Sequence, residues 1–264
     1  SSNYFKRGKP LQKVDYTPNG DKVYEELHTY SSILPEIKSN AVHQFGMMVC
    51  MPASGGQYGV NVYAKTAYQL ITTPFLPYTV TRKFYSSDYS GSSVSQTTTF
   101  VYDQYRNIYT VTAADSRGRE VVTTFRYPYH FANSANPLSP YTTLVNLNNI
   151  GAVIEKRTSV ANQVVSGEIY SYKVLGVNKV YNDAVYRLDL KDPLNVNSIG
   201  QTSSNAAGDL LFDSRYKEVG NFNYDISGNT SSFAKVGNET SSYIWDYNLQ
   251  MPTARIVNAS NIYA

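Results

Sequence analysis

The sequence predicts an all-β protein built from successive antiparallel hairpins, with one short helix. Apolar and polar residues alternate with period two over most of the chain, and dense turn signals separate the alternating runs. The composition agrees, because 25 Tyr and 10 Phe raise the aromatic fraction to 14%. Tyr packs its ring and leaves its hydroxyl in water, which suits strands that have one wet face.

The first predicted hairpin runs from Leu11 to Tyr30 and reverses at Pro18-Asn19-Gly20-Asp21. The Asn-Gly pair tolerates the positive φ values that tight hairpin turns require. From Gly59 to Asp103 two or three further β-prone runs follow. The Ser/Gly-rich stretch from Ser86 to Ser95 is interpreted as a hairpin tip rather than a phosphate-binding loop, since no helix follows it.

Another hairpin is predicted from Phe100 to Tyr129, with apolar β-formers on both sides of a reversal at residues 115–118. The one predicted helix lies near residues 140–149, where Ser139 is a suitable N-cap and Pro140 suits the first turn. Asn149 or Gly151 is expected to end it.

Alternation resumes over Glu168 to Gly176 and over Ala184 to Leu190. The stretch from Ser203 to Asp209 is predicted to be a polar loop. The whole chain, residues 1–264, is expected to form one β region, with a candidate sub-boundary near residues 131–140. Its abrupt start and end suggest a segment of a longer parent protein.

Two short segments, YDQYRN and YDISGN, align without a gap and indicate a repeated hairpin unit. Each has a Phe two positions earlier and an aromatic strand, FRYPY or YIWDY, twenty-odd residues later. The Tyr is expected to anchor the strand, the Asp to accept backbone N–H bonds in a turn, and Gly-Asn to take left-handed positions. The motif residues are Tyr102, Asp103 and Asn107 in the first copy and Tyr224, Asp225, Gly228 and Asn229 in the second.

Arg106 stands where the second copy has Gly228. A non-glycine residue in a left-handed position is strained. The earlier turn is therefore expected to be built differently or to be strained.

This pattern resembles the YD repeats of Rhs-type secreted and surface proteins. Three stretches look in particular like the long Rhs-like proteins of Bacteroidota: the ending TSSYIWDYNLQMPTARIVNAS, the segment LVNLNNIGAVIE and the start YFKRGKPLQKVDYTPNGD. The resemblance implies YD-repeat hairpins wound side by side into an extended strip or partial shell. It also implies an extracellular or cell-surface location, at the outer membrane of a Gram-negative bacterium.

The chain departs from toxin members of that family in two ways. It has no paired Asp-Pro-x-Gly signature of a self-cleaving region, and no toxin-like segment follows. Autoproteolysis and toxicity are therefore not carried over to this chain. The chain as the shell portion of a polymorphic toxin, whose effector region lies elsewhere, remains an alternative.

The sequence has no features typical of a nucleic-acid partner, a membrane span, or a metal or cofactor site. The net charge of +3 is spread along the chain, which argues against a nucleic-acid partner. No segment approaches the ~20 apolar residues of a membrane span. Cys50 is the single cysteine, so neither a disulfide framework nor a thiolate metal cluster is expected. His28, His43 and His130 lie far apart without metal-ligand spacing, and no metal or cofactor is predicted.

Paired carboxylates are the one candidate for enzymatic chemistry, because a glycosidase needs only two. The candidate pairs are Asp225 with Asp246, Asp103 with Asp115, and Glu25 with Glu26. Asp103 recurs at the position of Asp225, however, and recurrence is typical of a turn residue. The chain is therefore predicted not to be an enzyme.

Aromatic side chains are the candidate binding residues. Tyr243, Trp245 and Tyr247 alternate on one predicted strand, and an exposed row of rings stacks on sugars or grips a peptide. The same rings equally suit one packed face of a sheet, as do Tyr127, Tyr129 and Tyr141.

Three hypotheses follow. The chain is a structural segment that encloses, displays or docks another domain of its parent or a secretion-associated surface protein. Alternatively it is an extracellular module that binds glycan or protein through the aromatic row. The third is an enzyme that depends on Asp225 or Asp246.

Overall fold

The computed structural model describes residues 8–31, 43–49, 63–69, 76–86, 92–237 and 239–258. Most strand residues belong to one 14-stranded sheet, in which every pair of neighbouring strands is antiparallel. Its strands are β1 (Gln12–Tyr16), β2 (Lys22–Ser31), β5 (Leu76–Tyr85), β6 (Ser93–Tyr102), β7 (Ile108–Ala114), β8 (Glu120–Arg126), β9 (Glu155–Val160), β10 (Gln163–Val174), β11 (Val180–Leu188), β12 (Leu194–Asn195), β15 (Tyr216–Tyr224), β16 (Thr230–Lys235), β17 (Thr240–Asp246) and β18 (Met251–Val257).

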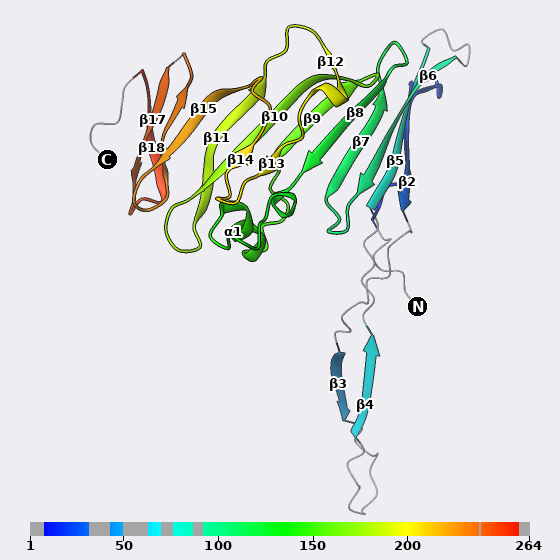
Figure 1. Ribbon diagram of the computed structural model, residues 1–264. Helices are drawn as coiled ribbons and strands as arrows, with labels where there is room; N and C mark the ends of the chain where they lie inside the picture. The colour runs from blue at the N-terminus through cyan, green and yellow to red at the C-terminus, as the bar shows by residue number, and fades with distance from the viewer. Residues whose placement is uncertain are drawn as a thin grey trace, which may run out of the picture.

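The spatial order of the strands follows the chain. The sheet runs β1-β2-β5-β6-β7-β8-β9-β10-β11-β15-β16-β17-β18, and β12 pairs with the start of β10. Figure 1 shows this order as a colour gradient across the sheet, from β2 at one end to β18 at the other. The predicted all-β strip of successive antiparallel hairpins with one short helix is confirmed for the described residues.

Two further strand pairs lie outside this sheet. β3 (His43–Val49) pairs with β4 (Tyr63–Gln69), and β13 (Ser203–Ser204) pairs with β14 (Leu210–Leu211). The prediction of a polar loop over residues 203–209 is therefore wrong at its first two residues, which enter a small hairpin. Cys50 and the tip of the Ser/Gly-rich loop, residues 87–91, lie outside the described residues.

The helix α1 spans Pro140–Asn146 and follows a single 3₁₀ turn, η2 (Pro128–His130). As predicted, Ser139 is the N-cap, and its Oγ accepts a hydrogen bond from the Thr142 N–H at 3.1 Å. The helix ends before residue 149, because Leu147 caps it and Asn148 adopts a left-handed φ of 58°. A left-handed residue just past the last turn is a common helix stop.

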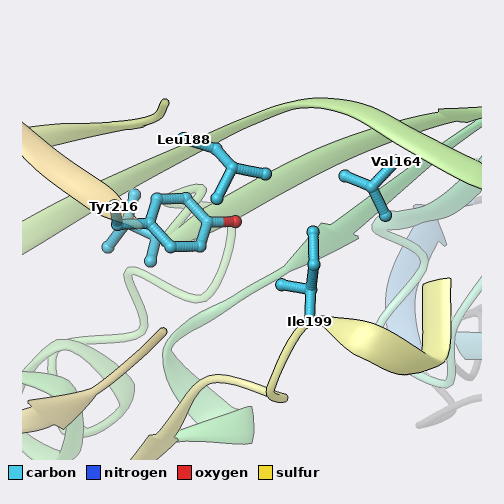
Figure 2. Close-up of a cluster of buried hydrophobic side chains, with 5 residues drawn as sticks. Val164, Leu188, Ile199 and Tyr216 are labelled. Atoms are coloured by element: carbon cyan, nitrogen blue, oxygen red, sulfur yellow. The ribbon is translucent and has the colours of Figure 1, made fainter. Parts of the chain in front are cut away.

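The core lies in the middle of the strip, where two connecting segments cover β10 and its neighbours. One segment joins β11 to β15 and contains β12, η3 (Val196–Ser198), β13 and β14. Ile199 from this segment points towards Val164, Leu188 and Tyr216 of the sheet (Figure 2). With Ile169 they form a buried cluster, and each is at most 9% exposed.

The second covering segment joins β8 to β9 and contains η2 and α1. It buries a cluster of four side chains: Phe131, Tyr141, Leu144 and Ile154. Leu210 of β14 packs against both clusters, so the two covering segments share one core. Residues 131–140, where a sub-boundary was expected, run through this cover, and Phe131 is only 1% exposed.

An ionic cluster fastens the first covering segment to the sheet. Glu155 of β9 is 2% exposed, and its Oε1 lies 2.7 Å from Arg157 Nη2 and 2.9 Å from the Thr202 hydroxyl that donates to it. Arg126 of β8 forms an ion pair with Glu155 and donates to the Thr202 carbonyl. A buried carboxylate is tolerated because paired charges and hydrogen bonds surround it.

Candidate functional site

Asp103 and Asp225 make the same hydrogen bonds in the turns β6–β7 and β15–β16. In each turn the Asp N–H donates to the carbonyl four residues later, and its carbonyl accepts from the N–H three residues later, at 2.9 to 3.0 Å. The Oδ1 atom of each accepts two N–H groups, two and four residues on, at 2.8 to 3.0 Å. These bonds describe a type I turn followed by a left-handed residue. Both carboxylates therefore fix a chain reversal.

The left-handed position is filled differently in the two copies. Gly228 adopts a φ of 91° and Arg106 a φ of 70°. The turn at Asp103 therefore has the same geometry as the turn at Asp225 but contains a strained residue. A non-glycine residue in this left-handed conformation costs about 1–2 kcal/mol. The prediction that Asn229 also takes a left-handed position is wrong, because Asn229 does not adopt a positive φ.

The Asn of each copy instead ties its turn to a later segment. Asn107 Nδ2 donates to the Ile150 carbonyl at 2.9 Å, and Asn229 Nδ2 donates to the Leu249 carbonyl at 2.8 Å. Each amide side chain thereby holds the backbone that follows the third strand of its unit.

An aromatic side chain at the end of the third strand completes both units: Trp245 lies within β17, and Tyr127 directly follows β8. The Tyr127 hydroxyl donates to the Ile108 carbonyl at 2.7 Å, and Trp245 Nε1 donates to the Thr230 carbonyl at 2.8 Å. Ile108 and Thr230 each lie five residues after the Asp of their turn. Trp245 is therefore the counterpart of Tyr127, which makes its ring part of the repeat.

The Tyr that precedes each Asp is partly buried, and burial raises its pKa in both copies, to about 12 for Tyr224. The Tyr224 ring lies 4.7 Å from that of Tyr181, and its hydroxyl donates to the Asn182 carbonyl at 2.8 Å. Tyr224 thus anchors β15 to β11.

The same turn recurs where the sequence alignment did not place it. Asp115, Asn205 and Thr17 each accept, through a side-chain oxygen, the N–H of the residue four positions on, at 2.9 to 3.1 Å. Their third following residues, Gly118, Gly208 and Gly20, all have positive φ. The signal in the sequence is a short polar residue followed three positions later by Gly.

Tyr243 and Trp245 lie side by side in one groove, whereas Tyr247 does not. The groove has a volume of about 770 Å³ and lies over β15 to β18. Its lining residues are Phe222, Thr230, Phe233, Tyr243, Trp245, Pro252, Thr253, Ala254 and Arg255. Tyr247 lies past the end of β17 with a φ of 52° and is 69% exposed, so the predicted alternation breaks there.

The second aromatic group, Tyr127, Tyr129 and Tyr141, is packed against other side chains rather than exposed to solvent. Tyr141 is 2% exposed and Tyr127 is 5% exposed, and burial raises the pKa of Tyr127 to about 12. The Tyr129 ring lies 4.6 Å from the His130 ring, and its hydroxyl donates to Asp103 Oδ2. Burial, and then the Arg126 charge, lowers the pKa of His130, so its ring is neutral at pH 7.

The carboxylate pairs are engaged in turns or in polar networks. Asp246 Oδ1 accepts the Tyr247 N–H at 2.7 Å. Glu25 accepts from the Tyr85 hydroxyl at 2.8 Å, and Glu26 accepts from the Tyr24 hydroxyl at 2.6 Å. In the described ranges, no group of three or more His, Cys, Asp or Glu could hold a metal ion.

Two of the three histidines can be placed from their side chains. The Nε2 atom of His28 lies 2.7 Å from Glu26 Oε1, and the Nδ1 atom of His130 accepts the Tyr127 N–H at 3.1 Å. His43 belongs to β3, whose side chains lie outside the description.

Sequence reasoning missed the cluster of Arg126, Glu155 and Arg157. Glu155 and Arg157 stand at alternate positions of one strand, a pattern of charged residues that is typical of a solvent-exposed face and gives no sign of burial. Only the segment that crosses over them, with Gly200 and Thr202, turns this strand face into an interior.

Comparison with known proteins yields little likeness. No protein-family model and no curated protein matches the chain. Among solved structures, it is similar to a porin-like protein from Bacteroides uniformis ATCC 8492, with 11% sequence identity and a TM-score of 0.22 over 69% of this chain and 84% of that chain. Over the described residues, no helix has the length and apolar character needed to cross a bilayer.

Proposed function

We propose that the chain is a non-enzymatic structural segment of a secreted or cell-surface protein of the Rhs/YD-repeat type. Its hairpin strip would form a wall that encloses, displays or docks another domain of the parent protein or a partner. The observation that carries this proposal is the repeat of one bonding scheme around Asp103 and Asp225, which extends to the aromatic donors Tyr127 and Trp245. Residues whose hydrogen bonds recur in a second copy of the unit are expected to stabilise the fold.

The distribution of burial supports a docking role. Outside the covered middle of the strip, the outer strands leave large apolar side chains exposed: Val94 at 73% and Met251 at 60% are examples. Repeat strips bury such faces only against neighbours. A wall that holds another domain would place that domain against these faces.

Cross-linking mass spectrometry on the full-length native protein tests this proposal. Lysines of the outer strands, such as Lys83 of β5 and Lys235 of β16, should cross-link to another domain or to a partner. A lysine of the covering segment, Lys191, serves as the matched internal control. If cross-links from all three stay within the strip, the docking role is wrong.

A binding module for extracellular glycan or protein is the second candidate. Its support is that Tyr243 and Trp245 share a groove of about 770 Å³ with two further aromatic rings. Trp245→Ala should abolish binding on glycan or peptide arrays, while Trp245→Phe, which keeps a ring, should retain part of it. Binding that is indifferent to both variants would remove this candidate.

A further inference from the structure

Two turns at one edge of the sheet end in exposed aliphatic side chains. Because neighbouring strands are antiparallel and follow the chain order, the connections after β6, β8, β10, β15 and β17 all lie at the same edge. This is the lower edge of the sheet in Figure 1, where α1 lies. In its β10–β11 turn Val177 is 88% exposed, and in its β15–β16 turn Ile226 is fully exposed.

The β15–β16 turn does not need the side chain of Ile226. In two other turns of the same kind, this position is filled by Gln104 and Ser116. The turn is held by backbone hydrogen bonds and by the Asp225 carboxylate. A fully exposed isoleucine also buries no apolar surface on folding, so it adds no hydrophobic stabilisation. Its aliphatic chain is therefore available to a surface outside the protein.

The two turns are neighbours. β10, β11, β15 and β16 are consecutive in the sheet, so the two apices are about 10 Å apart at a strand spacing of ~4.8 Å. A hollow of about 420 Å³ lies between them, and its lining includes Leu175 and Lys179 from the first turn and Ile226 from the second. Tyr181 and Tyr224 also line it, and their ring centroids lie 4.7 Å apart near the start of β11 and the end of β15. Two aliphatic apices therefore stand in front of a pair of tyrosine rings.

The lower edge carries few charges. Lys179 is exposed and forms no ion pair with a described residue. Asp225 is the acidic residue beside the hollow, and its Oδ1 accepts two N–H groups of its own turn. The connection from Tyr127 to Ile154, at the same edge, contains no Asp, Glu, Lys or Arg. Moving charge out of water costs free energy, so an edge of this composition can approach an apolar phase at little cost.

We propose that the lower edge lies on a lipid bilayer and inserts these two turns into it. Val177 and Ile226 enter the boundary between headgroups and acyl chains. Tyr181 and Tyr224 lie at the level of the headgroups, and the Lys179 ammonium binds an anionic headgroup. Isolated aliphatic side chains on separate apices suit a fluid surface, because lipids fill the space around each of them. This contact is independent of the docking role proposed above, and it goes beyond that role because it places the strip on a membrane surface.

Flotation of the 264-residue chain with vesicles of phosphatidylethanolamine and phosphatidylglycerol tests this contact. The chain should float with the vesicles. The double variant Val177→Asp, Ile226→Asp should bind at least about tenfold more weakly, because two apolar insertions are lost. Both positions are exposed, so the variant should fold as the original chain does, which circular dichroism checks. Val236→Asp, in a turn of the opposite edge, is the matched control and should leave binding unchanged.

The charge of Lys179 gives a second readout. Lys179→Gln should lower the affinity for these vesicles about fivefold, which is the contribution of one lysine near an anionic membrane surface. The difference should shrink as salt is added. On vesicles of phosphatidylcholine alone, which have no net charge, the variant should bind as the original chain does. Lys191→Gln, at an exposed position of the segment that joins β11 to β15, is the matched charge control.

Three results would overturn the membrane contact, and each leaves the structural role of the strip untouched. The first is a folded chain that does not float with the vesicles. The second is a double variant that floats as well as the original chain; if that variant also removes cross-links from Lys179 to another domain of the full-length protein, the two turns belong to a protein interface. The third is a loss of binding with Val236→Asp as large as with the double variant, which would show non-specific adsorption.

Discussion

Replacing Arg106 with glycine should stabilise the protein. Arg106 adopts a φ of 70° at the position that Gly228 fills in the other copy of the turn. Its side chain is exposed and makes no hydrogen bond or ion pair to any described residue. The substitution therefore removes backbone strain without removing a contact.

The size of the effect follows from two opposing contributions. A left-handed φ costs a non-glycine residue about 1–2 kcal/mol, which glycine avoids. Glycine also gives the unfolded chain more freedom, which costs ~0.4–1 kcal/mol of stability. The net gain should be about 0.5–1 kcal/mol, or a rise of roughly 1–3 °C in the melting temperature for a chain of this length.

Gly118→Ala is the matched control, because this residue has a φ of 75° in the same kind of turn and an added Cβ would meet no atom within 4 Å. It should destabilise the protein by about 1 kcal/mol through backbone strain alone. Urea unfolding and differential scanning calorimetry measure both variants. An Arg106→Gly variant that is no more stable than the original chain would refute the equivalence of the two turns.

Three further predictions concern acidic side chains. Hydrogen bonds from Tyr24 and then Arg82 lower the pKa of Glu26 from 4.5 to about 2, so the folded state favours the ionised carboxylate. This stabilisation should disappear as the pH falls from about 4.5 to 2. A series of melting temperatures measured over this pH range should fall less steeply for Tyr24→Phe than for the original chain. Glu155→Gln should cost about 3 kcal/mol in urea unfolding, because it leaves the partly buried guanidinium groups of Arg126 and Arg157 without their carboxylate. A cost below about 1 kcal/mol would contradict the role of Glu155 in fastening the covering segment to the sheet. Asp225→Asn should keep most of the stability, because an amide oxygen still accepts the two backbone N–H groups, whereas Asp225→Ala should lose about 1–2 kcal/mol. Equal losses for both variants in chemical denaturation would show that the charge of Asp225 matters rather than its hydrogen-bond acceptance.

Local patterns predicted much of the fold, because hairpins are local structures. The reversal at Asp115 and the cap at Ser139 depend on residues within five positions of each other, and both lie where the sequence placed them. The correspondence between Asp103 and Asp225 could also be predicted from the sequence, because the turn needs a hydrogen-bond acceptor at a fixed number of residues before a left-handed residue.

What could not be predicted depends on contacts between distant segments. Glu155 and Thr202 are 47 positions apart, and Trp245 and Thr230, 15 positions apart, meet only when β17 pairs with β16. The end of the alternation at Tyr247 was missed for another reason. A run of three left-handed residues, from Tyr247 to Leu249, turns the chain there without a glycine.

The distribution of burial connects the architecture to the docking proposal. Eleven of the twelve buried hydrophobic residues lie between Tyr127 and Tyr216, and Val80 is the exception among those described. The middle of the strip therefore has a core of its own, while the outer hairpins are held chiefly by ladder hydrogen bonds and cross-strand pairs. Amide hydrogen exchange should accordingly be slowest in β9 to β11 and fast in β16 to β18.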